Sequence, residues 1–334
     1  GFAERREEAR GRGRLRGFGF SVYQEPDGYK DNHVGLRFDH AGGLTLTISP
    51  VSNGQGTETT FAQVVSDQLG LPLEAITVIQ GDSDRVGVAT GAGGSRAATV
   101  TGTAIFRAAQ QIIEKGRRIA GQMMEASSDD IEFQGGAFSI WGTDRAIRLE
   151  EVAKASFGVA NLPDGFEFGL EATSHYIARV YSYPSGCHVC EIEIDPETGT
   201  VALVAYTAVN DFGRAINPML LAGQVHGGVT QGIGQVLLEN CVYDQETGQL
   251  MTGAFTDYGI PRADDVPFFT WARNEVLCTT NPLGIKGCGE SGCTASLATV
   301  MNAVVDALSP FGVTHLDMPA TPEKIWRICN PTPD

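Results

Sequence analysis

A glycine-rich loop that leads directly into an apolar helical pattern is the feature that most constrains this chain. The loop, residues 281–292, reads Asn-Pro-Leu-Gly-Ile-Lys-Gly-Cys-Gly-Glu-Ser-Gly and contains one carboxylate, Glu290. Its glycines permit positive φ and a close approach of the backbone to a bound group. Apolar residues at helical spacing follow, so the free N–H groups at a helix start would face an anion. The segment predicts a cofactor loop that carries an acid or a base.

Two known motifs match this loop only in part. Residues 287–292 have the letters of the dinucleotide fingerprint G-x-G-x-x-G, but no β-branched strand precedes them, and Asp306 falls within the helical pattern. Cys288 and Cys293 have the C-x4-C spacing of a plant-type iron–sulfur site, but Ser296 stands where the third cysteine is required. Taken alone, the loop is a weak match to a dinucleotide site and fails as a cluster site.

Length and charge bound the class of protein. A chain of 334 residues with 42% hydrophobic content can bury a substantial core and has the length of two domains or two lobes. Its formal net charge of −16 argues against a nucleic-acid partner, because phosphate binding requires a basic surface. No apolar run has the length of a membrane span, no signal-peptide pattern is present, and seven cysteines are typical of a reducing compartment. We expect a soluble, cytoplasmic protein without a membrane span.

A literal C-x-x-C at Cys187 and Cys190 lies in an alternating segment that predicts a strand. Successive strand side chains point to opposite faces, so these two thiols cannot share a metal or a disulfide. The same geometry places His188 on the face of Cys190 and predicts a core residue rather than a ligand. A hairpin loop is predicted at 195–199, between two alternating strands.

Strand and helix patterns are mixed rather than strictly alternating, which predicts an α+β fold with two mixed α/β lobes. Turn residues near 162–165 mark the predicted boundary. The first lobe is then 1–165, with a linker and entering strand at 1–36, and the second lobe is 166–334, with the catalytic loop at 284–293. Each half offers strand, glycine loop and helix, which hints at a duplicated plan.

Residues 223–234 keep helical spacing although they contain five glycines. Glycine inside a helix costs about 1 kcal/mol relative to alanine, so this density requires a reason. A ligand beside the helix is our preferred interpretation, and close packing against another helix is the alternative.

Four glycine-rich segments, around Gln55, Ser95, Gln224 and Glu290, suggest a large, flat, anionic cofactor held by backbone amides, carboxamides and a hydroxyl. With these segments in this order, the chain resembles the carboxy-terminal half of the molybdopterin-binding large subunit of the xanthine dehydrogenase and aldehyde oxidase family of molybdenum hydroxylases. The resemblance covers nearly the whole chain. It is carried by Gly54-Gln55-Gly56, Gln80-Gly81-Asp82-Ser83-Asp84, Gly94-Ser95-Arg96, Asp211-Phe212-Gly213-Arg214 with Asn217-Pro218, residues 224–234, and Gly287-Cys288-Gly289-Glu290.

The resemblance implies which residues serve the cofactor and the chemistry. The molybdenum would be held through the pterin, with no protein ligand of its own. Residues implied to contact the molybdopterin are Gln55, Gly56, Gly94, Ser95, Arg96, Ala97, Gln224 and Gly289. Members of the family oxidise a carbon centre of an aldehyde or an N-heteroaromatic compound with oxygen drawn from water, and the matching glutamate, Glu290, would be the general base on Mo–OH. Taken from the residues alone, Glu290 could instead cap a helix, and Gln55 and Gln224 could be buried amides that satisfy loop backbone.

The resemblance also implies partners. The large subunit of the family is about twice this length, so the chain is expected to be inactive without the other half, whether it is a split subunit or an excised fragment. FAD and [2Fe-2S] centres are expected on flavin and iron–sulfur partner subunits, and the substrate is a small molecule. The pterin is of the mononucleotide or the cytosine dinucleotide form, and a split chain favours the dinucleotide. Two other hypotheses stay open: a phosphate- or dinucleotide-binding module without molybdenum, and a cofactor-free assembly domain.

Overall fold

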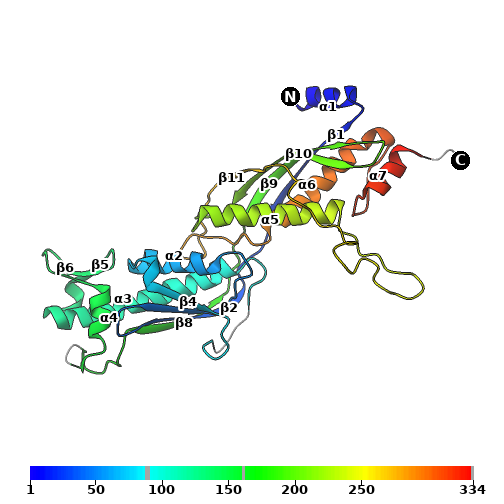
Figure 1. Ribbon diagram of the computed structural model, residues 1–334. Helices are drawn as coiled ribbons and strands as arrows, with labels where there is room; N and C mark the ends of the chain where they lie inside the picture. The colour runs from blue at the N-terminus through cyan, green and yellow to red at the C-terminus, as the bar shows by residue number, and fades with distance from the viewer. Residues whose placement is uncertain (87–90, 160–161, 332–334) are drawn as a thin grey trace.

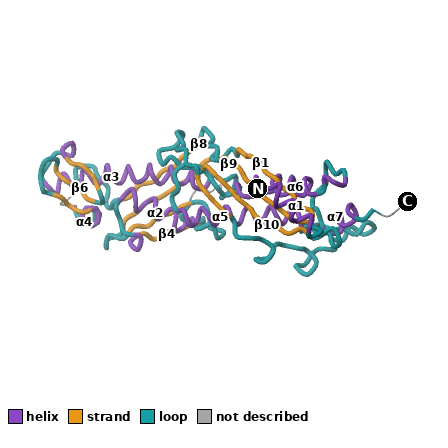
Figure 2. The backbone as a smooth tube through the Cα atoms, turned by 90° about the horizontal axis from the view of Figure 1, so that it is seen from above, coloured by secondary structure: helices purple, strands orange, loops and turns teal. Residues whose placement is uncertain are grey.

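The computed structural model describes residues 1–86, 91–159 and 162–331. The molecule is elongated, and its two four-stranded sheets, each with its own helices, lie one after the other along the long axis (Figures 1 and 2). Both termini lie in the same half (Figure 1). Within the described ranges, no helix is both long enough and apolar enough to cross a membrane.

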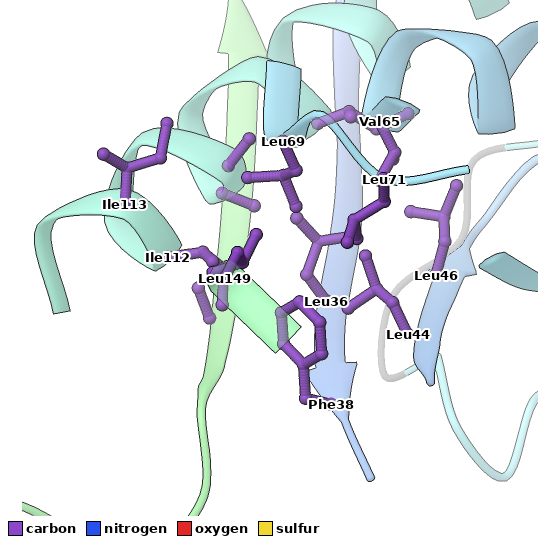
Figure 3. Packing of buried hydrophobic residues seen from close by; sticks show 14 of the residues in the cluster. Leu36, Phe38, Leu44, Leu46, Val65, Leu69, Leu71, Ile112, Ile113 and Leu149 are labelled. Atoms are coloured by element: carbon purple, nitrogen blue, oxygen red, sulfur yellow. The ribbon is translucent and has the colours of Figure 1, made fainter. Parts of the chain in front are cut away.

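The first sheet has the order β4-β3-β2-β8, with β2 at Lys30–Phe38, β3 at Leu44–Ile48, β4 at Ile76–Gln80 and β8 at Glu171–Ala178. Only the β3–β4 pair is parallel. Alternate residues of β3 are buried, as expected for a strand with one covered face. Helices α2 (Thr57–Leu69) and α3 (Gly102–Met124) supply that cover, and Figure 3 shows side chains of the strands and helices pointing toward one another in the resulting core.

A small three-stranded sheet and a short helix extend this half. The sheet contains β5 (Ile131–Gln134), β6 (Ala137–Ile140) and β7 (Ala146–Arg148), and α4 (Leu149–Ala155) follows it. Gly135 and Gly136 both have positive φ, which suits the two-residue turn between β5 and β6. Single helical turns occur at Leu73–Ala75, Ser128–Asp130 and Ser309–Phe311, and a π-helical turn at Ala97–Thr101 leads into α3.

The second sheet has the order β1-β9-β10-β11 and carries the second core. Its strands are β1 (Leu15–Gln24), β9 (Ser185–Ile194), β10 (Val201–Asp211) and β11 (Thr270–Arg273). The helices of this half are α1 (Phe2–Gly11), α5 (Pro218–Leu237), α6 (Ser291–Ala307) and α7 (Pro322–Cys329). A Cβ on Gly17 or Gly19 of β1 would lie 2.0 Å or 2.1 Å from a carbonyl oxygen of α6, so these glycines let the helix lie directly on the strand.

The α+β fold class is confirmed, and so are the predicted strand over the C-x-x-C and the hairpin after it. His188 is fully buried, and its ring nitrogens contact the Tyr206 hydroxyl at 2.8 Å and the Asn210 amide at 2.9 Å, so it is a core residue as predicted. The boundary at residue 165 stays a prediction. Strand β1 pairs with β9 and strand β8 pairs with β2, so the chain passes between the two sheets more than once.

Candidate functional site

A cavity of about 700 Å³ lies between the first half of the molecule and the second. Helix α2 and the loop before the π-helical turn form one side, and helix α5 and the loop before α6 form the other. All four glycine-rich segments singled out in the sequence contribute to it. The predicted site residues in its lining are Gln55, Ser95, Arg96, Ala97, Gln224, Gly289 and Glu290.

The segment at Gln55 turns sharply into α2. Gly54 and Gly56 have φ of 102° and 75°, values that favour glycine, and Gly56 is the residue that precedes the helix. The Gln55 carboxamide accepts a hydrogen bond from the Asn53 N–H and donates to the Val51 carbonyl at 3.3 Å. The side chain therefore satisfies its own loop, as the alternative interpretation held, while it also lines the cavity. Its contact with a cofactor stays a prediction.

The segment at Ser95 presents backbone to the cavity. Gly94 has φ of 57° and Ser95 has φ of 52°, and a Cβ on Gly93 or Gly94 would meet no atom within 4 Å. The backbone at these positions is thus open to a ligand. Gly94 donates its N–H to Glu290 Oε1 at 3.3 Å, which places this predicted residue beside the carboxylate of the other loop.

Arg96, which follows in the same loop, is buried at 5% exposure. Its guanidinium donates to the Gly91 carbonyl at 2.7 Å, a contact that ties the two ends of the loop together.

Glu290 stands exposed at the start of α6. Its side chain makes no capping hydrogen bond to the described turns of that helix, so the capping alternative does not describe it. Instead the carboxylate reaches across to Gly94, and the Glu290 N–H donates to Ser95 Oγ at 3.0 Å. The two glycine loops are thereby joined at the cavity wall.

The glycine-dense segment is helix α5. Gln224 and Gln231 on this helix line the cavity. On another side, a Cβ on Gly228 would lie 2.9 Å from the Cα of Gly292 in α6, whereas one on Gly227 would meet nothing within 4 Å. Close helix packing, the alternative interpretation, therefore explains at least part of the glycine content, and the ligand beside the helix stays a prediction.

The cavity wall carries more cations than carboxylates, although the chain as a whole is acidic. Three cations (Arg96, Arg214 and Lys286) and one carboxylate, Glu290, line it, although the chain carries a net charge of −16. Lys286 pairs with Asp211, while Arg214 is exposed. An exposed cation and open backbone amides suit an anionic ligand.

Sequence reasoning missed two buried carboxylates, Glu25 and Asp27, which follow β1 and lie beneath the Glu290 loop. Asp27 accepts hydrogen bonds from the Ser182 hydroxyl and the Gly287 N–H. Glu25 accepts from the Ser95 hydroxyl at 2.6 Å and the Ser291 hydroxyl at 3.1 Å. Burial raises the pKa of both carboxyl groups, and these hydrogen bonds oppose the rise. The letters Glu-Pro-Asp-Gly are typical of a surface turn, so the only signal was the alternating strand just before them.

Comparison with known proteins adds a family. Residues 1–267 match the molybdopterin cofactor-binding domain. The chain is 38% identical to the nicotine 6-hydroxylase large subunit of Paenarthrobacter nicotinovorans over 98% of its own length and 42% of that protein. It is 34% identical to the carbon monoxide dehydrogenase large chain of Hydrogenophaga pseudoflava over 87% of its own length and 36% of that protein.

Solved structures agree with these matches. Quinoline 2-oxidoreductase from Pseudomonas putida 86 superimposes with a TM-score of 0.91 at 36% identity, over 99% of this chain and 44% of that one. The Cu,Mo-containing CO dehydrogenase superimposes with a TM-score of 0.90 at 30% identity, over 97% of this chain and 42% of that one. The chain thus spans less than half the length of these relatives.

Proposed function

This chain belongs to the molybdopterin cofactor-binding family, and from that premise we propose that it forms part of a molybdenum hydroxylase, in which it binds the molybdopterin cofactor and supplies Glu290 as the general base. The observation that supports this proposal most is the convergence of four distant glycine-rich segments on one cavity, whose lining includes the carboxylate of Glu290. The other half of the large subunit would complete the enzyme.

The residues around the cavity fit the cofactor. A pterin with a phosphate tail needs hydrogen-bond donors and a positive wall, and the cavity offers the open backbone at Gly93, the carboxamides of Gln224 and Gln231, and the cation of Arg214. Gln55, Gly56, Ser95, Arg96, Ala97 and Gly289 complete the proposed binding set. A bound molybdopterin would supply the two-electron oxidation of a substrate carbon that gains its oxygen from water.

The proposed role of Glu290 is to move a proton. Its Oε1 accepts the Gly94 N–H, and Oε2 has no hydrogen-bond partner among the residues that the structure describes. An exposed carboxylate oxygen at the cavity can take a proton from a group bound there, and the hydrogen bond at Oε1 fixes the direction from which it does so. The Ser95 hydroxyl, which accepts the Glu290 N–H, holds the backbone of the same residue.

The substrate class we propose is an N-heteroaromatic compound or an aldehyde. The names of two relatives, a nicotine hydroxylase and a quinoline oxidoreductase, support the first of these. Electrons would leave through iron–sulfur and flavin subunits, and the cofactor would take the cytosine dinucleotide form.

Metal analysis and turnover of the assembled enzyme test this proposal. We expect molybdenum in the complex, oxidation of quinoline, nicotine or benzaldehyde, and a loss of turnover in Glu290→Gln with the molybdenum content unchanged. Glu197→Gln, an exposed glutamate in the turn between β9 and β10, is the matched control and should keep full activity. Absence of molybdenum, or normal turnover in Glu290→Gln, would refute the proposal, and tight NAD or FAD binding by the isolated chain would favour a dinucleotide module.

A further inference from the structure

Glu25 is a buried carboxylate with no part in the chemistry described so far. Glu25 is only 7% exposed, and among the described residues no cation pairs with its carboxylate. Burial disfavours the charged form of the Glu25 carboxyl and raises its pKa, so keeping this carboxylate buried costs free energy. A residue needed only for packing would be apolar, so the carboxylate requires a reason.

The Glu25 carboxylate accepts a hydrogen bond from the hydroxyl of Ser95 and thereby orients it. A serine hydroxyl has one proton to donate and lone pairs with which to accept. The Ser95 hydroxyl donates its hydrogen bond to Glu25 Oε1 at 2.6 Å. A lone pair of Ser95 Oγ is then free to accept the Glu290 N–H at 3.0 Å. The carboxylate therefore sets the direction of the hydroxyl, and the hydroxyl in turn holds the backbone of Glu290.

The second oxygen of Glu25 reaches the helix that Glu290 precedes. Ser291 Oγ donates to Glu25 Oε2 at 3.1 Å. Asp27, two residues along the chain, accepts the Gly287 N–H at the other end of the loop. Two carboxylates from one segment thus hold the loop on either side of Glu290, at Gly287 and at Ser291.

We propose that Glu25 is a positioning residue, which fixes the Glu290 carboxylate at the cavity by orienting the hydroxyls of Ser95 and Ser291. The inference rests on the proposed function for the role of Glu290, but the contacts that carry it are independent of any cofactor. Both hydroxyls donate, so the junction needs two acceptor oxygens. A glutamine offers one acceptor oxygen and one donor group, so it can accept the proton of only one of the two serines, and the other hydroxyl must turn to accept from its amide.

Hydrogen exchange and kinetics of the assembled enzyme test this inference together. The variants are Glu25→Gln, Ser95→Ala and the double variant. The matched control is Glu191→Gln, a buried glutamate of β9 whose partners are Arg5 and Arg16 and which is outside the cavity lining. We expect the Glu290 amide to exchange about fivefold to tenfold faster in the three variants than in wild type, and at the wild-type rate in the control.

Kinetics should show the same coupling. With quinoline, nicotine or benzaldehyde as the probe, kcat should fall about 10- to 100-fold in each single variant. In Glu25→Gln, which is outside the proposed binding set, KM and molybdenum content should stay within about twofold of wild type. The double variant should be no slower than the slower single variant, because both changes break one chain of hydrogen bonds. Unchanged exchange of the Glu290 amide in Glu25→Gln, or losses in kcat that multiply in the double variant, would overturn the inference. If the complex lacks molybdenum, the proposed function fails, but the exchange result still decides whether Glu25 holds the Glu290 backbone.

Discussion

Two adjacent glycines of helix α5 should respond to the same substitution in opposite directions. Gly228 faces α6, and a Cβ there would lie 2.9 Å from the Gly292 Cα, 3.0 Å from the Cys293 nitrogen and 3.2 Å from the Gly292 carbonyl carbon. All three are backbone atoms, which cannot rotate away. Gly227 is exposed on the same helix, and a Cβ there would meet nothing within 4 Å.

The magnitudes follow from these distances. Ordinary contacts of a Cβ are 3.4–4 Å long, so Gly228→Ala must push the two helices apart by about 0.5–1 Å, an overpacking that costs about 1–3 kcal/mol. Both substitutions gain up to about 1 kcal/mol from the helix propensity of alanine, and this gain cancels between them. The free energy of unfolding should therefore differ by about 1–3 kcal/mol between the two variants, with Gly227→Ala the more stable.

Urea unfolding of the chain, followed by circular dichroism, measures this difference. We expect a higher midpoint than wild type for Gly227→Ala and a lower one for Gly228→Ala. Equal midpoints for the two variants would show that α5 and α6 do not approach as closely as the structure has them. The reasoning about the glycine-dense helix would then be wrong, and a ligand would be the better explanation of its composition.

Three further predictions concern charged groups. Glu290→Gln should lower kcat of the assembled enzyme by about 100- to 10,000-fold, measured under saturating substrate, because an amide cannot accept the proton. Between the ordinary pKa of Glu25 near 4.5 and its raised folded value, the folded chain binds more protons than the unfolded chain, so stability falls as pH rises. Urea midpoints across that window should fall less steeply in Glu25→Gln. Arg16→Met should lower the free energy of unfolding by about 2–4 kcal/mol, because it strips a buried cation from Glu191 and Glu193, and midpoints unchanged from wild type would contradict this.

Local patterns predicted strands and helices at several places along the chain. Alternation alone placed Cys187 and Cys190 on a strand and His188 in the core, because the side-chain period of a strand depends only on its own backbone. The resemblance named four segments, and the structure brings Gln55, Ser95, Gln224 and Glu290 to one cavity. Whether they bind the cofactor stays a prediction.

Contacts between distant segments could not be predicted in the same way. Glu25 and Asp27 follow a strand as part of a turn-like sequence, and only the pairing of β1 with β9 and its contact with α6 bring them under the Glu290 loop. Similarly, the letters of α5 cannot separate a glycine that faces a helix from one that faces solvent. Gly228 and Gly227 differ only in which neighbour lies opposite.

Anomalous diffraction at the molybdenum edge from crystals of the assembled enzyme tests the central claim most directly. We predict a molybdenum peak in the cavity between α2 and α5, on the side where the Glu290 carboxylate meets Gly94. A peak elsewhere in the complex, or density of another ligand in this cavity, would contradict the claim.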